Sequence, residues 1–223
     1  AQWLLTKKGA GNDIGLSGVS FLKTDDTLDL PDIQMHFIGS LLKDHGKTRP
    51  DSHAFSNHVC MLRPESRGYI ALKSLDPHIQ PIIQPNYFST QKDRDTLIKG
   101  VKMSREIMNQ PAFDDFRGKE INPGDHIQTD QEIEEFIRNH GETIYHPVGT
   151  CKMGSDEFSV VDDKLRVRGV ENLRVIDASV MPTLIGGNTN APTIMIADKI
   201  SDHILGNEFL PSQHVSYKEK NAA

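Results

Sequence analysis

The hydrophobic period of the chain changes near residue 90, and this change restricts the possible folds more than any other feature. Before it, apolar and polar residues often alternate in short segments separated by Pro, Gly and Asp. Such alternation is typical of antiparallel strands with one wet face. Four segments have this character: "GVSFLKT" (18–24), "DIQMHFI" (32–38), "SNHVCMLRP" (56–64) and "GYIALKS" (68–74). We therefore predict an antiparallel sheet between about residues 17 and 90.

After the change, two segments have the period of amphipathic helices. Segment 91–109 follows Thr90, which with Asp93 forms a candidate capping box, and Pro111 closes its far end. Its apolar residues share one helical face: Leu97, Ile98, Val101, Ile107 and Met108. Segment 130–140 opens in the same way with Thr129 and Glu132, buries Ile133, Phe136 and Ile137, and stops at Gly141. Together with the sheet, these helices predict an α+β fold with the helices on one face of the sheet.

The character changes again beyond residue 145. The segment "LRVIDAS" is a continuous apolar run that ends with Asp177, which favours a strand in the middle of a parallel sheet. A glycine turn then leads into a helix within 184–205, for which Asn190 is the predicted N-cap and Pro192 falls in the first turn. The expected buried face of this helix consists of Ile194, Ala197, Ile200, Ile204 and Leu205.

Composition excludes several classes of function. The net charge of −6 leaves no basic stripe for phosphates, so we expect no nucleic-acid partner. No apolar run reaches the length that spans a bilayer, and no signal peptide is recognisable at the N-terminus. Two cysteines give no disulfide framework and fit a reducing compartment. Four histidines among the predicted strands lack metal-ligand spacing, and no metal site is predicted: His36, His45, His53 and His58.

The stretch "ETIYHPVGTCKMG" (142–154) contains a candidate catalytic histidine. Pro147 restricts the backbone of His146 to an extended conformation, and Gly149 permits a tight turn. A fixed imidazole is the commonest general base, but this pattern by itself favours a turn histidine without chemistry. A thiol nucleophile at Cys151, activated by His146, is a further reading. The helix that starts at "GNTNAPT" directs its free N–H groups at whatever precedes it, and these would stabilise developing negative charge.

Three motifs in order, "YHPVGTCKMG", "VVDDKLRVRGVENLRVIDASVMPT" and "GGNTNAPTIMIADKISDHIL", resemble the C-terminal part of the glucose-methanol-choline (GMC) oxidoreductases. The likeness is greatest to the bacterial branch of choline dehydrogenases and aliphatic alcohol dehydrogenases. The segments "MLRPESRGYIALKS" and "PIIQPNYFS" are similar to the substrate domain of that family, and "GVKMSREIMNQPAF" is similar to its helix. The resemblance covers nearly the whole chain.

The resemblance implies oxidation of an alcohol by hydride transfer to N5 of FAD. It implies that His146 is the catalytic base and that Asn188 is its partner at the substrate oxygen. It also implies that Asp177 and Ala178 lie near the FAD diphosphate, whereas Asn190, Pro192 and Thr193 lie against the pyrimidine edge of the flavin. The expected partners are a small alcohol and an electron acceptor, either a quinone or oxygen.

The chain lacks the G-x-G-x-x-G turn that would begin an FAD domain. We therefore expect a C-terminal portion of a larger enzyme: a substrate-binding domain at 1–145, the active-site loop and the C-terminal segment of an FAD domain at 146–206, and a polar tail at 207–223. This portion alone is expected to bind no FAD and to be inactive, with residues 160–205 poorly supported or covered by self-association. The alternative is a stand-alone binding module with non-functional flavin motifs.

The sequence leaves the substrate, the oligomeric state and the membrane contacts open. Aromatic residues make up 6% of the chain, and no cluster indicates a cage for the quaternary nitrogen of choline. This observation favours an aliphatic or generic primary alcohol over choline. The expected location is the cytoplasm, with peripheral association of the whole enzyme at the inner membrane and a homo-oligomer as open alternatives.

Overall fold

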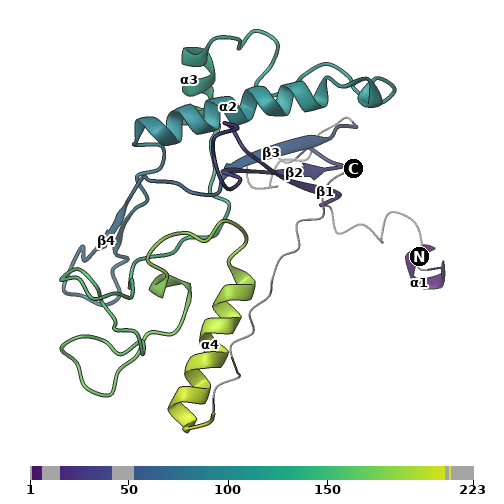
Figure 1. Ribbon diagram of the computed structural model, residues 1–223. Helices are drawn as coiled ribbons and strands as arrows, with labels where there is room; N and C mark the ends of the chain where they lie inside the picture. Colours follow the sequence, from purple (N-terminus) through teal and green to yellow (C-terminus); the bar gives the residue numbers. More distant parts are fainter. Residues whose placement is uncertain (1, 7–15, 42–52, 209–210, 212–223) are drawn as a thin grey trace.

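The computed structural model describes residues 2–6, 16–41, 53–208 and 211. The α+β class predicted from the sequence is confirmed (Figure 1). The strands are β1 (Gly18–Leu22), β2 (Ile33–Ile38), β3 (Ser56–Met61), β4 (Tyr69–Ala71) and β5 (Ile82–Gln84). The α-helices are α1 (Gln2–Thr6), α2 (Gln91–Met108), α3 (Asp130–His140) and α4 (Asn190–Leu205), and two 3₁₀ turns are η3 (Pro111–Phe113) and η4 (Ala178–Val180). His45, one of the four histidines for which no metal site is predicted, lies outside the described residues.

The strands form two antiparallel sheets instead of the single sheet predicted from the sequence. One sheet has the order β1-β2-β3, and the other is the hairpin β4-β5. The break follows from the segment after β3. The backbone N–H of Leu62 still donates to Asp32 O, but Pro64 has no N–H, and the N–H groups of Glu65 and Ser66 donate to the side chain of Asp93.

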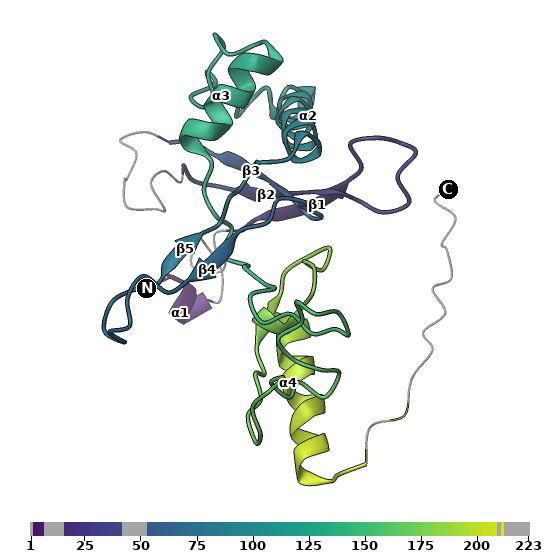
Figure 2. The same ribbon diagram turned by 90° about the vertical axis from the view of Figure 1, so that its left-hand side faces the viewer.

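Helices α2 and α3 cover one face of the three-stranded sheet, as predicted, and α4 lies on the other side of that sheet (Figure 2). Gly100 of α2 permits the close approach, because a Cβ atom there would lie 2.7 Å from Val59 Cγ1 and 3.0 Å from Ile33 Cδ1. Residues from both helices and the segment before α2 form the first core: Phe88, Ile98, Ile133 and Ile137.

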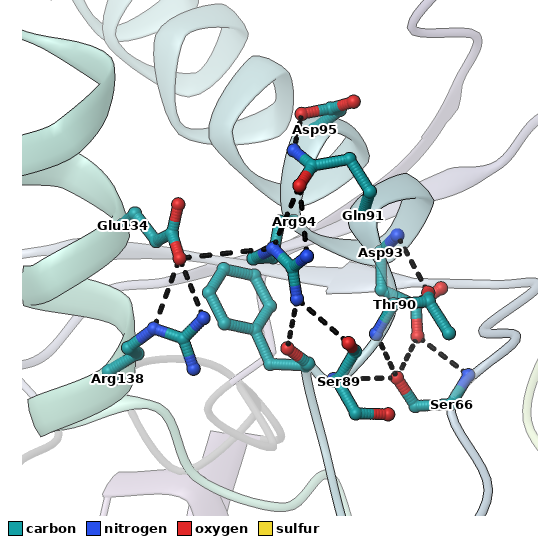
Figure 3. Close-up of polar contacts among 10 residues, drawn as sticks. Ser66, Ser89, Thr90, Gln91, Asp93, Arg94, Asp95, Glu134 and Arg138 are labelled. Carbon is teal, nitrogen blue, oxygen red and sulfur yellow. Dashed lines mark hydrogen bonds and ion pairs between the residues drawn. The ribbon is translucent and has the colours of Figure 1, made fainter.

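The start of α2 differs in one respect from the predicted capping box. The Thr90 side chain accepts a hydrogen bond from the backbone N–H of Asp93, as expected. The Asp93 carboxylate, however, turns to the segment after β3. There it accepts from the backbone N–H of Glu65, and from the backbone N–H and the hydroxyl of Ser66 (Figure 3). The side chain that would close the box therefore fixes a neighbouring segment to the helix.

The start of α3 is the predicted capping box. Thr129 Oγ1 accepts from the backbone N–H of Glu132, and Glu132 Oε2 accepts from the backbone N–H of Thr129 at 2.8 Å. Of the three residues predicted to be buried, Ile133 is 0% exposed and Ile137 is 8% exposed, whereas Phe136 is partly buried against the same core. Local sequence signals thus fix both ends of this helix.

The part beyond residue 145 has its own small core: Val161, Leu165, Val180 and Ile200. The predicted strand in "LRVIDAS" is absent; among the described residues 160–205, pairing is limited to isolated bridges such as Arg166 with Arg174. An extended segment becomes a strand only with neighbours that take up its N–H and C=O groups, and here the backbone N–H of Val175 donates to Leu165 O of an irregular loop.

Most of the predicted buried face of α4 is exposed. Ile200 is buried, but Ile194, Ile204 and Leu205 are 60%, 54% and 73% exposed. Ala197 is partly buried. The helical period correctly identified the helix, but burial also needs a packing partner, and the described part of the chain covers only Ile200 fully. Within the described residues no helix combines the length and apolarity needed to cross a membrane.

Candidate active site

The loop that carries His146 is fixed to the segment around η4. The backbone N–H of Cys151 donates to Ser179 O at 3.1 Å, and that of Met153 donates to Val180 O at 2.8 Å. Gly149 has φ +91°, so the turn predicted at this glycine is present, and it brings the backbone close to Met181 O. Tyr145, just before the histidine, has φ +64°, a left-handed backbone conformation that residues other than glycine seldom adopt.

This loop brings His146 and Asn188 together across 42 residues of sequence. Asn188 Nδ2 lies 3.2 Å from His146 Nε2. The other ring nitrogen, His146 Nδ1, lies 2.9 Å from the hydroxyl of Thr189, which is only 7% exposed. The imidazole is half-buried and is held at both nitrogens, which fixes its plane. General-base chemistry requires an imidazole held in a fixed position, and these contacts are compatible with that requirement.

Strand β2 directs its two faces at different parts of the molecule. The sulfur of Met35 lies beside Asn57, whose amide also donates to Ser104 of α2, so this face belongs to the helices. Successive side chains of a strand alternate between faces, and the Gln34 side chain donates from Nε2 to Asn188 Oδ1 at 3.3 Å. The polar face predicted to be wet therefore adjoins the candidate active site.

His36 shares the face of Gln34, and its neighbours are other histidines. It is 8% exposed, and its pKa is lowered by burial first and then by the nearby charges of His58 and His146. Cys60, opposite Gln34 on β3, has a pKa raised to about 11 by burial. These effects favour the neutral forms of both side chains on this face of the sheet.

Helix α4 begins at the site, and its N-cap is one residue earlier in the sequence than the predicted Asn190. Thr189 is the N-cap, and Asn190 is the first helical residue. Thr189 makes no capping hydrogen bond with its side chain, because that hydroxyl meets His146, and the first turn contains no acidic residue. Thr193 donates to Thr189 O from its hydroxyl at 2.6 Å. A helix start without a side-chain cap or an acidic neighbour fits an anionic group, and the pyrimidine edge of a reduced flavin is such a group.

The other two predicted cofactor residues lie at η4. The carboxylate of Asp177 accepts from the backbone N–H of Ser179 at 2.8 Å and caps this 3₁₀ turn, and Ala178 is its first residue. Ser179 is in turn bonded to the His146 loop through Cys151. In the described part of the chain no hydrogen bond joins Asp177 to His146, so Asp177 and Ala178 are connected to His146 and Asn188 only through the loop.

The thiol alternative has no support in the geometry. Both ring nitrogens of His146 are engaged by Thr189 and Asn188, and within the described residues no hydrogen bond joins the Cys151 thiol to the imidazole. Among the same residues no three His, Cys, Asp or Glu side chains are grouped as metal ligands would be.

Sequence reasoning missed three residues of this site: Gln34, His36 and Thr189. The alternation in "DIQMHFI" places Gln34 and His36 on one face, but nothing local indicates what that face meets, since Gln34 and Asn188 are 154 residues apart. Thr189 lies between two asparagines that both favour N-cap positions, and its neighbour was the stronger candidate.

Comparison with known proteins identifies the family of the chain. The family model described as GMC oxidoreductase matches residues 64–197, and the chain belongs to this family. The oxygen-dependent choline dehydrogenase of Cronobacter sakazakii is 47% identical over 217 residues, and that of Escherichia coli is 46% identical. Each of these alignments covers 97% of this chain but 39% of the relative, so the chain spans about two fifths of their length.

Solved structures show the same likeness. The pyridoxine 4-oxidase of Mesorbium loti matches with a TM-score of 0.79 at 27% identity, over 87% of this chain and 39% of its own. The formate oxidase of Aspergillus oryzae RIB40, whose FAD modification has been studied, matches with a TM-score of 0.74 at 27% identity, over 80% of this chain and 32% of its own. The chain is therefore similar to one part of longer oxidoreductases, and members of its family bind FAD.

Proposed function

We propose that this chain is the active-site portion of an FAD-dependent enzyme that oxidises the CH–OH group of an alcohol to an aldehyde. One observation carries the proposal: His146 and Asn188 are 3.2 Å apart, side by side at the start of α4. A base and a neutral donor in this arrangement can act on the two ends of one hydroxyl group. The family membership of the chain supports the same reaction class.

In this proposal each site residue has a distinct task. His146 accepts the hydroxyl proton at Nε2, and Asn188 donates a hydrogen bond to the substrate oxygen and orients it. Thr189 holds the opposite edge of the imidazole, so the ring does not rotate away from the substrate. When bound, FAD would supply the redox chemistry by taking up the hydride.

The residues proposed to hold FAD come from two helix starts. Asn190, Pro192 and Thr193, in the first turn of α4, would lie against the pyrimidine edge. Asp177 and Ala178, at η4, would lie near the diphosphate. The absence of acidic residues from the first turn of α4 supports the first assignment, because a carboxylate there would repel an anionic flavin.

We further propose the division of the chain that the sequence predicted. Residues 1–145 would form the substrate-binding domain, 146–206 the active-site loop and the C-terminal segment of an FAD domain, and 207–223 a polar tail. The separate core of the part beyond residue 145 supports a boundary near His146. The apolar side chains exposed on α4 would then be covered by other parts of the FAD domain, which the described residues do not include.

The substrate is proposed to be choline or an aliphatic alcohol, with oxygen or a quinone as the electron acceptor. The names of the curated relatives favour choline and oxygen, whereas the low aromatic content of the chain favours an uncharged alcohol. A stand-alone binding module, the competing function, would not need His146 and Asn188 in hydrogen-bond contact, and their geometry therefore favours the enzyme.

The direct test is an assay of the full-length protein, loaded with FAD, against choline and a series of aliphatic primary alcohols. Each substrate is tested with oxygen alone and with an artificial electron acceptor. We expect aldehyde formation with at least one alcohol and its loss in His146→Ala. A full-length protein that binds FAD but oxidises none of these alcohols would contradict the proposal.

A further inference from the structure

The two ring nitrogens of His146 meet partners of different hydrogen-bonding character. Asn188 Nδ2, 3.2 Å from His146 Nε2, carries only donor hydrogens, so Nε2 must accept there and cannot carry a proton. A neutral imidazole has one N–H, which therefore lies on Nδ1 and donates to Thr189 Oγ1 at 2.9 Å. The bare nitrogen is thus the one that faces Asn188.

The orientation of the Asn188 amide, on which this assignment depends, is set by Gln34. The Nε2 group of Gln34 donates to Asn188 Oδ1 at 3.3 Å, which directs the opposite end of the Asn188 amide to His146. Gln34 is 3% exposed, and its Oε1 lies 4.0 Å from the Cys60 thiol, a weak donor. Each group in this series donates toward the imidazole: the thiol to Gln34, Gln34 to Asn188, and Asn188 to His146 Nε2.

We propose that Gln34 and Thr189 are positioning residues that hold His146 as the neutral Nδ1–H tautomer, with Nε2 bare toward the substrate. This inference rests on the proposed function, since it concerns the base of that reaction. Gln34 acts through Asn188 from strand β2, and Thr189 acts directly on Nδ1 from the start of α4. Each residue constrains a different edge of the ring, and the same tautomer results from both.

The native ionisable side chains around the site are retained in every variant below, and Gln34→Glu adds one carboxyl group to them. His36 and His58 face it from strands β2 and β3, and Glu142 precedes the catalytic loop near His58. The guanidinium of Arg63 lies against Gly186, just before Asn188. Any change of pH profile among the variants therefore arises from the replaced side chain.

Replacing Gln34 by glutamate gives the sharpest test, because a carboxylate accepts but does not donate. Asn188 must then rotate to donate to it, and Asn188 Oδ1 meets His146 Nε2, which stabilises a proton on that nitrogen. We expect Gln34→Glu to lower kcat at neutral pH by about tenfold or more and to move the rising limb of the pH profile to higher pH. Gln110→Glu is the matched control, since it makes the same charge change at an exposed position past the far end of α2.

Replacing Thr189 by valine removes the acceptor of Nδ1–H at nearly constant size. The hydrogen bond that holds the ring is then lost, and we expect kcat to fall about fivefold to tenfold, with KM changing less. Thr189→Ser restores the hydroxyl and should recover most of the loss. This pair keeps the inference testable if Gln34→Glu fails to fold.

The tautomer itself is measured by ¹⁵N NMR of the histidine-labelled, full-length holoenzyme, with the His146 signals assigned by comparison with His146→Gln. We expect a protonated Nδ1 and a bare Nε2 in the wild type, and a shift toward Nε2–H in Gln34→Glu. A wild type with its proton on Nε2, or a Gln34→Glu variant with an unchanged tautomer, would overturn the inference. This measurement needs no turnover. A full-length protein that oxidises no alcohol would refute the proposed function, and the tautomer of His146 would still be decided by the NMR spectrum.

Discussion

Replacing Asp93 by asparagine tests the contact that joins the start of α2 to the segment after β3 (Figure 3). The Asp93 carboxylate is 1% exposed and accepts from the backbone N–H groups of Glu65 at 2.9 Å and Ser66 at 2.8 Å, and from the Ser66 hydroxyl. An asparagine amide has a single acceptor oxygen, so its NH₂ group would oppose one of these donors. A buried donor without a partner costs about 1–3 kcal/mol, and the bonds that remain lose their charge. We expect Asp93→Asn to lower the free energy of unfolding by about 2–4 kcal/mol.

Urea unfolding at pH 7, followed by circular dichroism, measures this loss. Asp95→Asn is the control, because it makes the same charge change on the same helix at an exposed residue that accepts from Gln91 Nε2 at 2.7 Å. The control should change the stability by less than about 0.5 kcal/mol. If Asp93→Asn loses no more than Asp95→Asn, the buried carboxylate does not hold this part of the fold together.

The same contact predicts a dependence on pH. Burial raises the pKa of Asp93, but the hydrogen bonds from Glu65 and Ser66 outweigh it and lower the pKa below the ordinary value of 3.8. A carboxyl group with a lowered pKa in the folded state stabilises the fold above its unfolded pKa and loses this effect as the pH falls. The stability difference between wild type and Asp93→Asn should therefore shrink as the pH falls below 3.8. A difference that stays constant down to pH 2 would contradict this reasoning.

Three further predictions concern the site and one helix cap. In the full-length enzyme, His146→Ala should lower kcat about 10² to 10⁴-fold while the flavin absorbance is retained, and Asn188→Ala should lower it less, because the base remains. Loss of the flavin with His146→Ala would instead assign the residue to the cofactor. Cys60, with a pKa of about 11, should react with iodoacetamide at pH 8 about a hundredfold more slowly than a thiol of pKa 9.0; equal rates would mean that the thiol is open to solvent. Thr129→Ala should lower the free energy of unfolding by about 1 kcal/mol in urea, and no change would mean that the capping box of α3 is not stabilising.

Elements with local signals were the predictable part of the fold. Helix α3 is fixed by Thr129 and Glu132 at one end and by Gly141 at the other, and its buried residues follow the 3.6-residue period. Strands β1 to β3 follow the alternation of apolar and polar side chains. In each case the information needed lies within about ten residues, so the sequence is sufficient.

Predictions that depended on distant partners were the ones that failed. The run "LRVIDAS" has the apolar content of a central strand, but a strand also needs neighbours for its backbone groups, and none pairs with it in the described residues beyond the bridge at Arg174. The predicted burial of one face of α4 fails for the same reason, since Ile194 and Leu205 are apolar yet exposed. The structure contains a contact between His146 and Asn188. The sequence could predict this pair only because the family resemblance named Asn188, since no local pattern connects the two residues.

Strand β2 connects the stability of the fold to the chemistry of the site. Ile33, which is 0% exposed, meets Gly100 of α2, whereas the adjacent Gln34 reaches Asn188 on the opposite face. Because side chains alternate along a strand, a slip of one residue in register would place Gln34 in the helical core and direct an apolar side chain at Asn188. The antiparallel pairs of β2 with β1 and β3, from Leu22 opposite Ile33 to Ile38 opposite Ser56, prevent that slip. The close contact with α2 that fixes the sheet therefore also determines which amide end Asn188 presents to His146.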